Sequence, residues 1–363
     1  MSFVLAASRS TGGRKNEKMK IKEALTYDDV LLVPQYSDIK SRSEVNISST
    51  LRGNGPTTKL GLPIIASPMD TVSEEEMGIA MWQAGALAIV HRYNSIEDQL
   101  DILDGIIVNA GSNAAAAIGV SGDYLNRATA LYDVGVRILC VDVAHGHHTL
   151  MKETLQDLRN VFGDAVHIMA GNVATLEGYN DLVDWGADSV RCNIGGGSIC
   201  STRIQTGHGV PGLHTIINCA RSDRNAPIIA DGGIRNSGDI VKALAAGADF
   251  VMLGSLLSGT DEAPGDIIST RKGKFKSYRG MASKDAQMDW RGNVSSLEGI
   301  TTVVPYKGPV INILQELENG IRSGLSYSGA RNLKELRENA QFVRQTQSGL
   351  AESNTHIKWR YDA

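Results

Sequence analysis

A cysteine at the end of a glycine-rich segment is the residue of this chain best suited to covalent chemistry. Residues 193–203 read Asn-Ile-Gly-Gly-Gly-Ser-Ile-Cys-Ser-Thr-Arg, so Cys200 follows soon after three consecutive glycines. Glycines let a ligand approach the backbone closely, and a thiolate beside a bound ligand can act as a nucleophile. The same pattern also fits a buried structural cysteine on a glycine turn, and the local sequence leaves both interpretations open.

The glycine-rich segment can also bind a ligand through its backbone. Consecutive glycines expose N–H groups, which can hold a phosphate, and carbonyl groups, which can hold a monovalent cation. Ser198 adds a hydroxyl that can donate to a phosphate oxygen, and two further glycine turns follow apolar runs, at 231–233 and 254–255. Asp231, which opens the first of these turns, can accept from a ribose diol or can simply form the turn.

Three closely spaced histidines follow another apolar run, which ends in Asp142. His145, His147 and His148 resemble metal ligands, but no HExxH spacing accompanies them. We therefore expect these histidines to line a ligand groove rather than to hold a catalytic metal. No Gly-x-Gly-x-x-Gly motif follows a strand and opens a helix, so the sequence does not indicate a Rossmann cofactor domain.

Eight apolar runs, each followed by an amphipathic segment, must position these residues. Such runs, without polar alternation, are typical of parallel strands that are buried on both faces. Glycine joints recur before the runs, as in the echo between 185–188 and 246–249. This cadence predicts a (β/α)₈ TIM barrel rather than an open doubly wound sheet, with its site at the carboxyl ends of the strands. The runs are 63–67, 86–91, 114–120, 137–144, 167–173, 189–194, 227–234 and 250–257.

Helical periodicity fills the gaps between the runs. Ser73, followed by Glu75 and Glu76, indicates a capped helix start. The helices that we expect are 73–83, 95–107, 124–134, 150–161, 176–184, 213–220, 238–246, 310–322 and 331–345.

We expect one catalytic domain with short extensions. Residues 1–20 are predicted to be a flexible N-terminal arm, 21–350 the barrel domain and 351–363 a C-terminal tail. Within the barrel domain, the Gly-rich, charged segment 259–308 follows the eighth run. A long irregular segment on the side of the active-site loops is typical of a lid or a binding loop.

Composition narrows the classes of protein to consider. The chain has 36 Lys and Arg against 40 Asp and Glu, a formal net charge of −4, which does not favour nucleic-acid binding. No apolar run approaches the ~18 residues that span a bilayer. The four cysteines form no CxxC pair, and the run at 3–7 is too short for a signal peptide. We expect a cytoplasmic protein with free thiols and no membrane partner.

Six motifs in order resemble the IMP dehydrogenase / GMP reductase family, over about residues 25–345. The resemblance implies a (β/α)₈ barrel, usually a homotetramer, that binds a purine nucleoside monophosphate and a nicotinamide cofactor. The motifs lie at 25–34 (LTYDDVLLVP), 69–72 (MDTV), 171–173 (GNV), 197–200 (GSIC), 231–233 (DGG) and 278–281 (YRGM).

The same resemblance implies roles for individual residues. Cys200 would form a covalent adduct with C2 of the purine, and Asp142 and Asn172 would line the nicotinamide side. The glycine-rich segment resembles the family's potassium loop, in which the backbone carbonyls of Gly195, Gly197 and Cys200 would face the ion. The residues expected to bind the nucleotide are Ser198, Asp231, Gly233, Gly254, Ser255, Tyr278, Gly280 and Met281.

Two features favour the reductase branch of this family. The dehydrogenase usually carries a regulatory CBS insert after the second strand, where this chain has only residues 95–114, enough for one helix and a turn. The dehydrogenase also hydrolyses its intermediate with an Arg-Tyr pair in its lid, and here the nearest match is Trp290-Arg291. Thr202 and Glu298 match a pair that can relay a proton to departing ammonia. We therefore expect NADPH-dependent reductive deamination of GMP to IMP.

Two alternatives remain. The first is an IMP dehydrogenase without CBS domains, converting IMP to XMP with NAD, because the segments 144–147 and 262–265 look more like that enzyme. The second is a non-catalytic binder of purine nucleotides. It is suggested by the short lid and by Asn193 and Gly196, which stand where the family commonly has Gly and Pro; Arg191 likewise stands where Lys is common.

Overall fold

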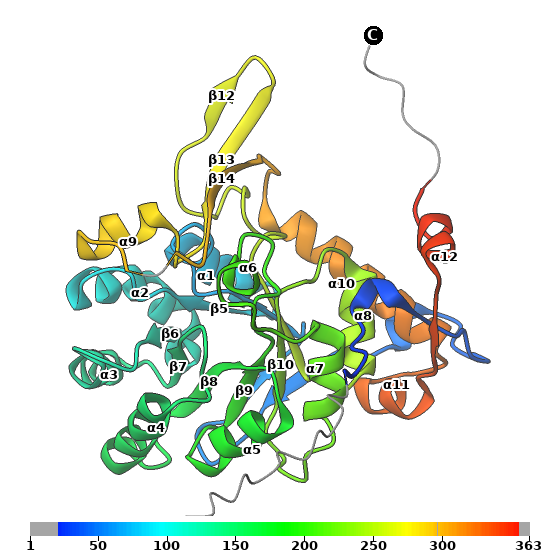
Figure 1. Cartoon of the computed structure of the whole chain (residues 1–363), viewed down its shortest axis with the longest axis horizontal. Coiled ribbons are helices and arrows are strands. Elements are labelled where there is room, and N and C mark those ends of the chain that lie inside the picture. The colour runs from blue at the N-terminus through cyan, green and yellow to red at the C-terminus, as the bar shows by residue number, and fades with distance from the viewer. Residues whose placement is uncertain (1–20, 296, 356–363) are drawn as a thin grey trace, which may run out of the picture.

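Eight parallel strands form a closed barrel (Figure 1) in the computed structural model, which describes residues 21–295 and 297–355. The strand order around the barrel is β10-β11-β4-β5-β6-β7-β8-β9, so each strand lies beside its neighbour in sequence and β11 closes onto β4. Each predicted apolar run contains one barrel strand, which confirms the predicted TIM barrel. The strands are β4 (Ile64–Ala66), β5 (Leu87–Val90), β6 (Ala115–Ile118), β7 (Ile138–Asp142), β8 (His167–Val173), β9 (Ser189–Cys192), β10 (Ile228–Asp231) and β11 (Phe250–Leu253).

The barrel interior is a packed apolar core. Inward-facing side chains such as Ile89, Met169 and Phe250 are fully buried, as expected for strands covered on both faces. The hairpin of β2 (Ser49–Leu51) and β3 (Thr58–Leu60) adds Leu51 and Leu60 to the same cluster. This hairpin closes the end of the barrel where the strands begin, so ligand access is left to the opposite end.

Helices surround the barrel close to their predicted positions. At the first helix the prediction that Ser73 caps the N-terminus is wrong. Glu74 is the N-cap and its side chain makes no capping bond, while the Ser73 hydroxyl donates to the Ser67 carbonyl at 2.7 Å. The helices are α1 (Glu75–Gln83), α2 (Ile96–Ala110), α3 (Tyr124–Asp133), α4 (Thr149–Phe162), α5 (Leu176–Asp184), α7 (Gly212–Cys219), α8 (Ser237–Ala245) and α10 (Val310–Tyr327).

The echoed glycine joints before β9 and β11 end in aspartates with the same structural task. Asp188 accepts from the Ile168 N–H at 2.8 Å, and Asp249 accepts from the Ile228 N–H at 2.9 Å. Each carboxylate also forms an ion pair with an arginine: Asp188 with Arg159, and Asp249 with Arg337. The repeated sequence therefore encodes a repeated link between adjacent strands at the closed end of the barrel.

Asp188→Ala should destabilise the fold strongly. The carboxylate is 1 % exposed and also accepts from the N–H groups of Asn54 at 2.8 Å and Gly55 at 3.3 Å, so its removal leaves Arg159 and three backbone donors without this partner. Breaking a buried pair in this way typically costs about 3–5 kcal/mol. Urea unfolding of the variant and the wild-type chain measures the loss; a difference below about 1 kcal/mol would contradict this role.

A buried histidine should make stability depend on pH. Burial lowers the pKa of His167 to about 4, although Asp188 partly opposes the shift. Because the unfolded histidine titrates near pH 6.5, stability is full above that value and falls as the pH drops toward 4. Between pH 7.5 and pH 5 the loss should be about 2 kcal/mol by urea unfolding. His167→Gln should remove this component of the pH dependence, whereas His208→Gln, on the surface, should retain it.

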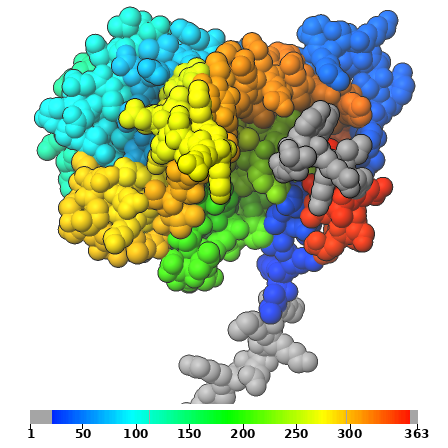
Figure 2. All heavy atoms as spheres, turned by 90° about the horizontal axis from the view of Figure 1, so that it is seen from above, coloured from blue at the N-terminus to red at the C-terminus, as the bar shows by residue number. Residues whose placement is uncertain are grey.

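The lid segment is more regular than expected. It contains a three-stranded antiparallel sheet of β12 (Ile268–Thr270), β13 (Gly273–Arg279) and β14 (Thr301–Pro305), and the helix α9 (Lys284–Arg291). The sheet projects from the top of the barrel in Figure 1, and Figure 2 shows lid atoms in yellow and gold beside the cyan region that includes α2. The expectation of an irregular lid is wrong. Strand β13 buries Lys276, and because lysine is normally solvent-exposed, the local sequence does not predict a buried strand there.

The last predicted helix ends early. Helix α11 (Leu333–Asn339) stops at Ala340, and β15 (Phe342–Arg344) pairs antiparallel with β1 (Val30–Leu32). The partner strand lies about 310 residues away in sequence, so helical periodicity could not reveal this pairing. A short helix, α12 (Gln347–Glu352), follows.

Three other expectations concern a regulatory insert, the two ends of the chain and membrane-spanning helices. Between β5 and β6 the chain forms only α2 and a short 3₁₀ turn, Gly111–Asn113. The predicted arm at 1–20 and the end of the tail, 356–363, lie outside the described residues. In residues 21–295 and 297–355, no helix is both long enough and apolar enough to cross a membrane.

Candidate active site

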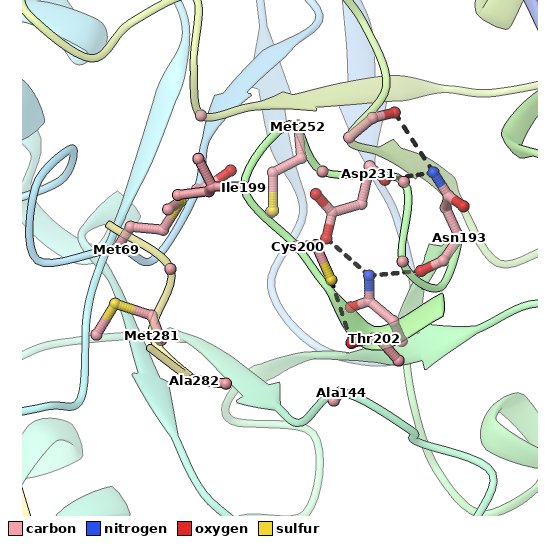
Figure 3. A pocket seen from close by; sticks show the side chains of 18 of the residues that line it. Met69, Ala144, Asn193, Ile199, Cys200, Thr202, Asp231, Met252, Met281 and Ala282 are labelled. Carbon is pink, nitrogen blue, oxygen red and sulfur yellow. Dashed lines mark hydrogen bonds between the residues drawn. The ribbon is translucent and has the colours of Figure 1, made fainter. Parts of the chain in front are cut away.

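One pocket (Figure 3) opens at the carboxyl ends of the barrel strands, and it collects every residue for which a catalytic, nucleotide-binding, cofactor-binding or ion-binding role was predicted. Its wall is built from the loops that follow the strands, together with part of the lid. The predicted residues that line it are Asp142, Asn172, Gly195, Gly197, Ser198, Cys200, Thr202, Asp231, Gly233, Gly254, Ser255, Tyr278, Gly280, Met281 and Glu298.

Cys200 heads a chain of hydrogen bonds inside this pocket. Its thiol donates to the Thr202 hydroxyl at 3.1 Å, and that hydroxyl donates to Glu298 Oε2 at 2.8 Å. Cys200 is half-buried and lines the pocket, whereas Cys140, Cys192 and Cys219 are buried in the fold. The arrangement favours the nucleophile interpretation over a structural cysteine, because the sulfur faces the cavity beside a proton-carrying pair.

Backbone pairing explains how Glu298 reaches Cys200 across the sequence. The lid backbone at 298–300 runs antiparallel to the glycine-rich segment, with a β-bridge between Cys200 and Gly299. The Ser201 N–H donates to the Glu298 carbonyl at 2.9 Å, and the Ile300 N–H donates to the Ile199 carbonyl at 3.1 Å. The short helix α6 (Thr202–Thr206) begins directly after this bridge. The lid therefore carries one member of the relay and cannot be separated from the site.

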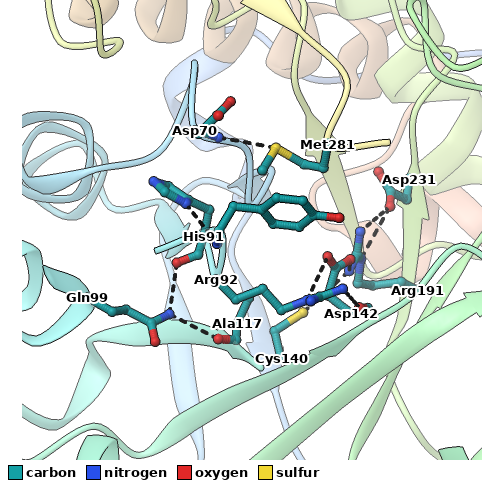
Figure 4. Close-up of polar contacts among 11 residues, drawn as sticks. Asp70, His91, Arg92, Gln99, Ala117, Cys140, Asp142, Arg191, Asp231 and Met281 are labelled. Carbon is teal, nitrogen blue, oxygen red and sulfur yellow. Dashed lines mark hydrogen bonds and ion pairs between the residues drawn. The ribbon is translucent and has the colours of Figure 1, made fainter. Parts of the chain in front are cut away.

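A buried arginine joins two predicted site carboxylates at the pocket floor (Figure 4). The Arg191 guanidinium donates to Asp142 Oδ1 at 2.5 Å and to Asp231 Oδ2 at 2.8 Å, and Asn172 Nδ2 also donates to Asp231 at 2.8 Å. Burial alone would lower the pKa of Arg191, but the two carboxylates hold it well above its ordinary value. Sequence reasoning did not assign this residue to the site, although a charged residue inside an apolar run was a usable signal.

Glycines let three loops meet on the other side of the pocket. A Cβ on Gly254 would lie 2.9 Å from the Tyr278 hydroxyl, and one on Gly232 would lie 3.1 Å from the Gly197 nitrogen. Tyr278 is buried, which raises its pKa to about 12 even though a hydrogen bond with Ser198 acts in the opposite direction. This tyrosine therefore stays protonated and can donate to an anion such as a phosphate.

Two polar atoms of pocket-lining residues are buried and have no hydrogen-bond partner. They are Asn172 Oδ1 and Arg92 Nε, and the latter lies 3.9 Å from Asp142 Oδ2. Asn172 and Arg92 carry an amide and a guanidinium group, which can bond to a carboxamide such as that of nicotinamide in the pocket. The carbonyls of Gly195, Gly197 and Cys200 are oxygen donors suited to a hard monovalent cation, although the Gly197 carbonyl also accepts from the Cys200 N–H at 3.2 Å.

The three histidines do not line this pocket, so that expectation is wrong. His147 Nε2 lies 2.8 Å from Asp181 of α5, and His148 Nδ1 accepts from the Leu150 N–H at the start of α4. The side chains of His147 and His148 thus bond to the outer helices α5 and α4, which local spacing did not show. Within the described residues, no three metal-ligating side chains are grouped around a common point.

Comparison with known proteins places this architecture in a family. The sequence profile of the "IMP dehydrogenase / GMP reductase domain" matches residues 24–356, almost the whole chain. The chain belongs to the IMP dehydrogenase / GMP reductase family. The resemblance drawn from the six motifs is thereby confirmed.

Similar proteins within the family carry both names. The inosine-5'-monophosphate dehydrogenase of Nitrosopumilus maritimus is 34 % identical, over 93 % of this chain and 99 % of the relative. The GMP reductase of Leishmania major is 33 % identical, over 92 % of this chain and 97 % of the relative. The first alignment spans 475 positions against 363 residues here, so that relative has segments that this chain lacks.

A solved structure gives the same fold. A cysteine-to-alanine variant of GMP reductase from Trypanosoma brucei, in complex with guanosine 5'-monophosphate, superimposes with a TM-score of 0.87. The two proteins are 33 % identical, over 94 % of this chain and all of the other. Family membership and the barrel are therefore shown, while the family includes two different reactions.

Proposed function

We propose that this protein is a GMP reductase, which converts GMP to IMP and ammonia with NADPH. The observation that carries the proposal is the Cys200–Thr202–Glu298 relay in a lid whose sequence between 281 and 298 contains no Arg-Tyr pair. This relay can deliver a proton to a leaving amine, and the lid offers no such pair to activate water. The similar structure from Trypanosoma brucei, which binds GMP, supports a purine nucleotide as the ligand.

The chemistry starts at Cys200. The Cys200 thiol passes its proton through Thr202 to Glu298, and the resulting thiolate adds to C2 of the guanine. The proton then returns through the Thr202 hydroxyl to the exocyclic nitrogen. The bond from C2 to this nitrogen breaks, and ammonia leaves while the purine stays attached to sulfur. Asp142 and Asn172 would hold NADPH on their side of the pocket, where it would supply a hydride for C2 and Cys200 would depart as a thiolate.

The pocket wall orients the two ligands. Ser198 and Tyr278, with the glycine turns, would hold the phosphate, and Asp231 Oδ1 would accept from the ribose of GMP, because Oδ2 is already occupied by Arg191 and Asn172. Asp142 and Asn172 would hold the nicotinamide side, and Met281 would lie beside the purine. The pocket's carbonyl oxygens would complete the site with potassium. A homotetramer in the cytoplasm stays part of the proposal.

Three assays test the proposed reaction. Purified protein should oxidise NADPH in the presence of GMP and release equimolar IMP and ammonia, with slower turnover when NADH replaces NADPH. IMP with NAD should yield no XMP. Turnover of only the second pair would identify a dehydrogenase, the function that the dehydrogenase-like segment 262–265 and the equally similar relatives favour. Tight GMP binding without turnover of either pair would identify a non-catalytic binder.

A further inference from the structure

Asn193, the first residue after β9, has an unusual backbone conformation for its type. Its φ is +132°, and it is the one non-glycine residue with positive φ in the part of the chain that the structure describes. Its side chain is buried, with the residue 3 % exposed. A strained backbone of this kind persists only where its surroundings hold it, so the contacts of the Asn193 side chain should show what holds this conformation.

The Asn193 amide links the elements around the catalytic loop. Its Nδ2 donates to the Asp231 carbonyl at 2.9 Å, and its Oδ1 accepts from Arg203 Nη2 at 3.1 Å. Its backbone carbonyl accepts from Asn172 Nδ2 at 2.9 Å. In Figure 3 its amide nitrogen points toward the loop of Asp231, between the ends of β9 and β10. One side chain therefore ties the loop after β9 to the loop after β10 and to helix α6.

The same amide fills the space beneath Gly196. A Cβ built on Gly196 would lie 2.0 Å from Asn193 Nδ2 and 2.8 Å from Asn193 Cγ, and its three nearest atoms all belong to Asn193. Gly196 is not among the residues with positive φ, so its backbone would accept an alanine. The side chain of Asn193 is thus the nearest obstacle to a side chain at position 196.

We propose that Asn193 is a positioning residue, an internal brace that sets the place of the loop carrying Cys200 and thereby requires glycine at position 196. The inference deepens the proposed function and rests on it for the role of Cys200. The brace acts through the loop: Gly196 is held on the amide, and four residues later Cys200 meets the lid at its bridge to Gly299. Moving the loop at Gly196 shifts the sulfur relative to Thr202 and Glu298.

A double-mutant cycle tests this brace. Gly196→Ala should lower kcat/KM by about 100-fold, because the new methyl group must displace the amide. Asn193→Gly should lower it by about tenfold, through loss of the hydrogen bonds of its side-chain amide with Asp231, Gly232 and Arg203. If the two residues oppose each other sterically, Asn193→Gly/Gly196→Ala should resemble Asn193→Gly alone rather than show the product of both losses. The alkylation rate of Cys200 by iodoacetamide, read on the Cys200 peptide, should follow the same pattern.

The outcomes separate this proposal from the reaction itself. Alkylation needs no turnover, so the cycle can be read even if the protein converts neither GMP nor IMP. Thermal unfolding shows whether Gly196→Ala folds. If it does not, the proposal predicts that the double variant Asn193→Gly/Gly196→Ala folds again. Losses that multiply, a Gly196→Ala variant as active as the wild type, or a double variant that fails where Asn193→Gly succeeds would each overturn the proposal.

Discussion

Cys200→Ala should abolish conversion of GMP, with kcat falling by at least about 10³-fold, because Cys200 is the one cysteine among the residues that line the pocket. The thiol that donates to Thr202 at 3.1 Å is the first member of the relay, and alanine removes the attacking atom while leaving the cavity wall in place. Binding of GMP, measured by calorimetry, should persist, since the predicted phosphate and ribose contacts come from other residues.

Cys219→Ala is the matched control for this prediction. Cys219 is a buried thiol at the end of α7 and does not line the active-site pocket. Its replacement should leave kcat within about twofold of the wild type. GMP should also protect Cys200 from alkylation. Turnover by Cys200→Ala within tenfold of the wild type would exclude covalent catalysis by this residue.

Glu298→Gln should lower kcat by about 10²–10⁴-fold, the usual contribution of a positioned acid or base. Glu298 Oε2 accepts from the Thr202 hydroxyl at 2.8 Å, and an amide in that place cannot exchange the proton that departing ammonia requires. Thr202→Val should cause a similar loss by breaking the same relay. Since the two side chains act as a unit, the double variant should be no slower than the slower single variant.

A carboxylate elsewhere in the lid provides the control for the relay. Asp285, exposed in the first turn of α9, should tolerate change to asparagine with less than about a twofold effect on kcat. Steady-state kinetics and direct measurement of ammonia release distinguish the variants. Effects of Glu298→Gln and Thr202→Val that multiply would show independent roles, and a loss below threefold for Glu298→Gln would remove it from the relay.

The lid accounts for most of what local patterns missed. Lys276 is buried because its ammonium group donates to the Thr260 carbonyl at 3.0 Å and to the Asp261 carbonyl at 3.3 Å. A lysine with carbonyl partners from another segment can sit inside a fold, but nothing near it in sequence announces those partners. Tyr278 lies two positions after Lys276 on the same face of β13, so the strand that buries Lys276 also places Tyr278 in the pocket.

Much of the barrel and the composition of its site followed from the chain's local patterns. Apolar runs at a regular spacing reveal parallel strands because burial on both faces removes polar alternation, and the ends of such strands meet at one rim. That rule was enough to group Cys200 with Asp231, whereas Tyr278 was assigned to the site only by the family resemblance. The echoed aspartates also follow local sequence, since each bonds to the strand beside it.

Only the tertiary structure decided how distant segments complete the site. The bridge between Cys200 and Gly299, the Arg191 link between two carboxylates, and the Asn193 amide beneath Gly196 all depend on which loops come together in space. Hydrogen-bond geometry and steric exclusion act over a few ångströms, so they become defined only when the folded backbone places the partners. The histidine cluster shows the converse, because His147 and His148 follow a barrel strand in sequence yet bond to outer helices.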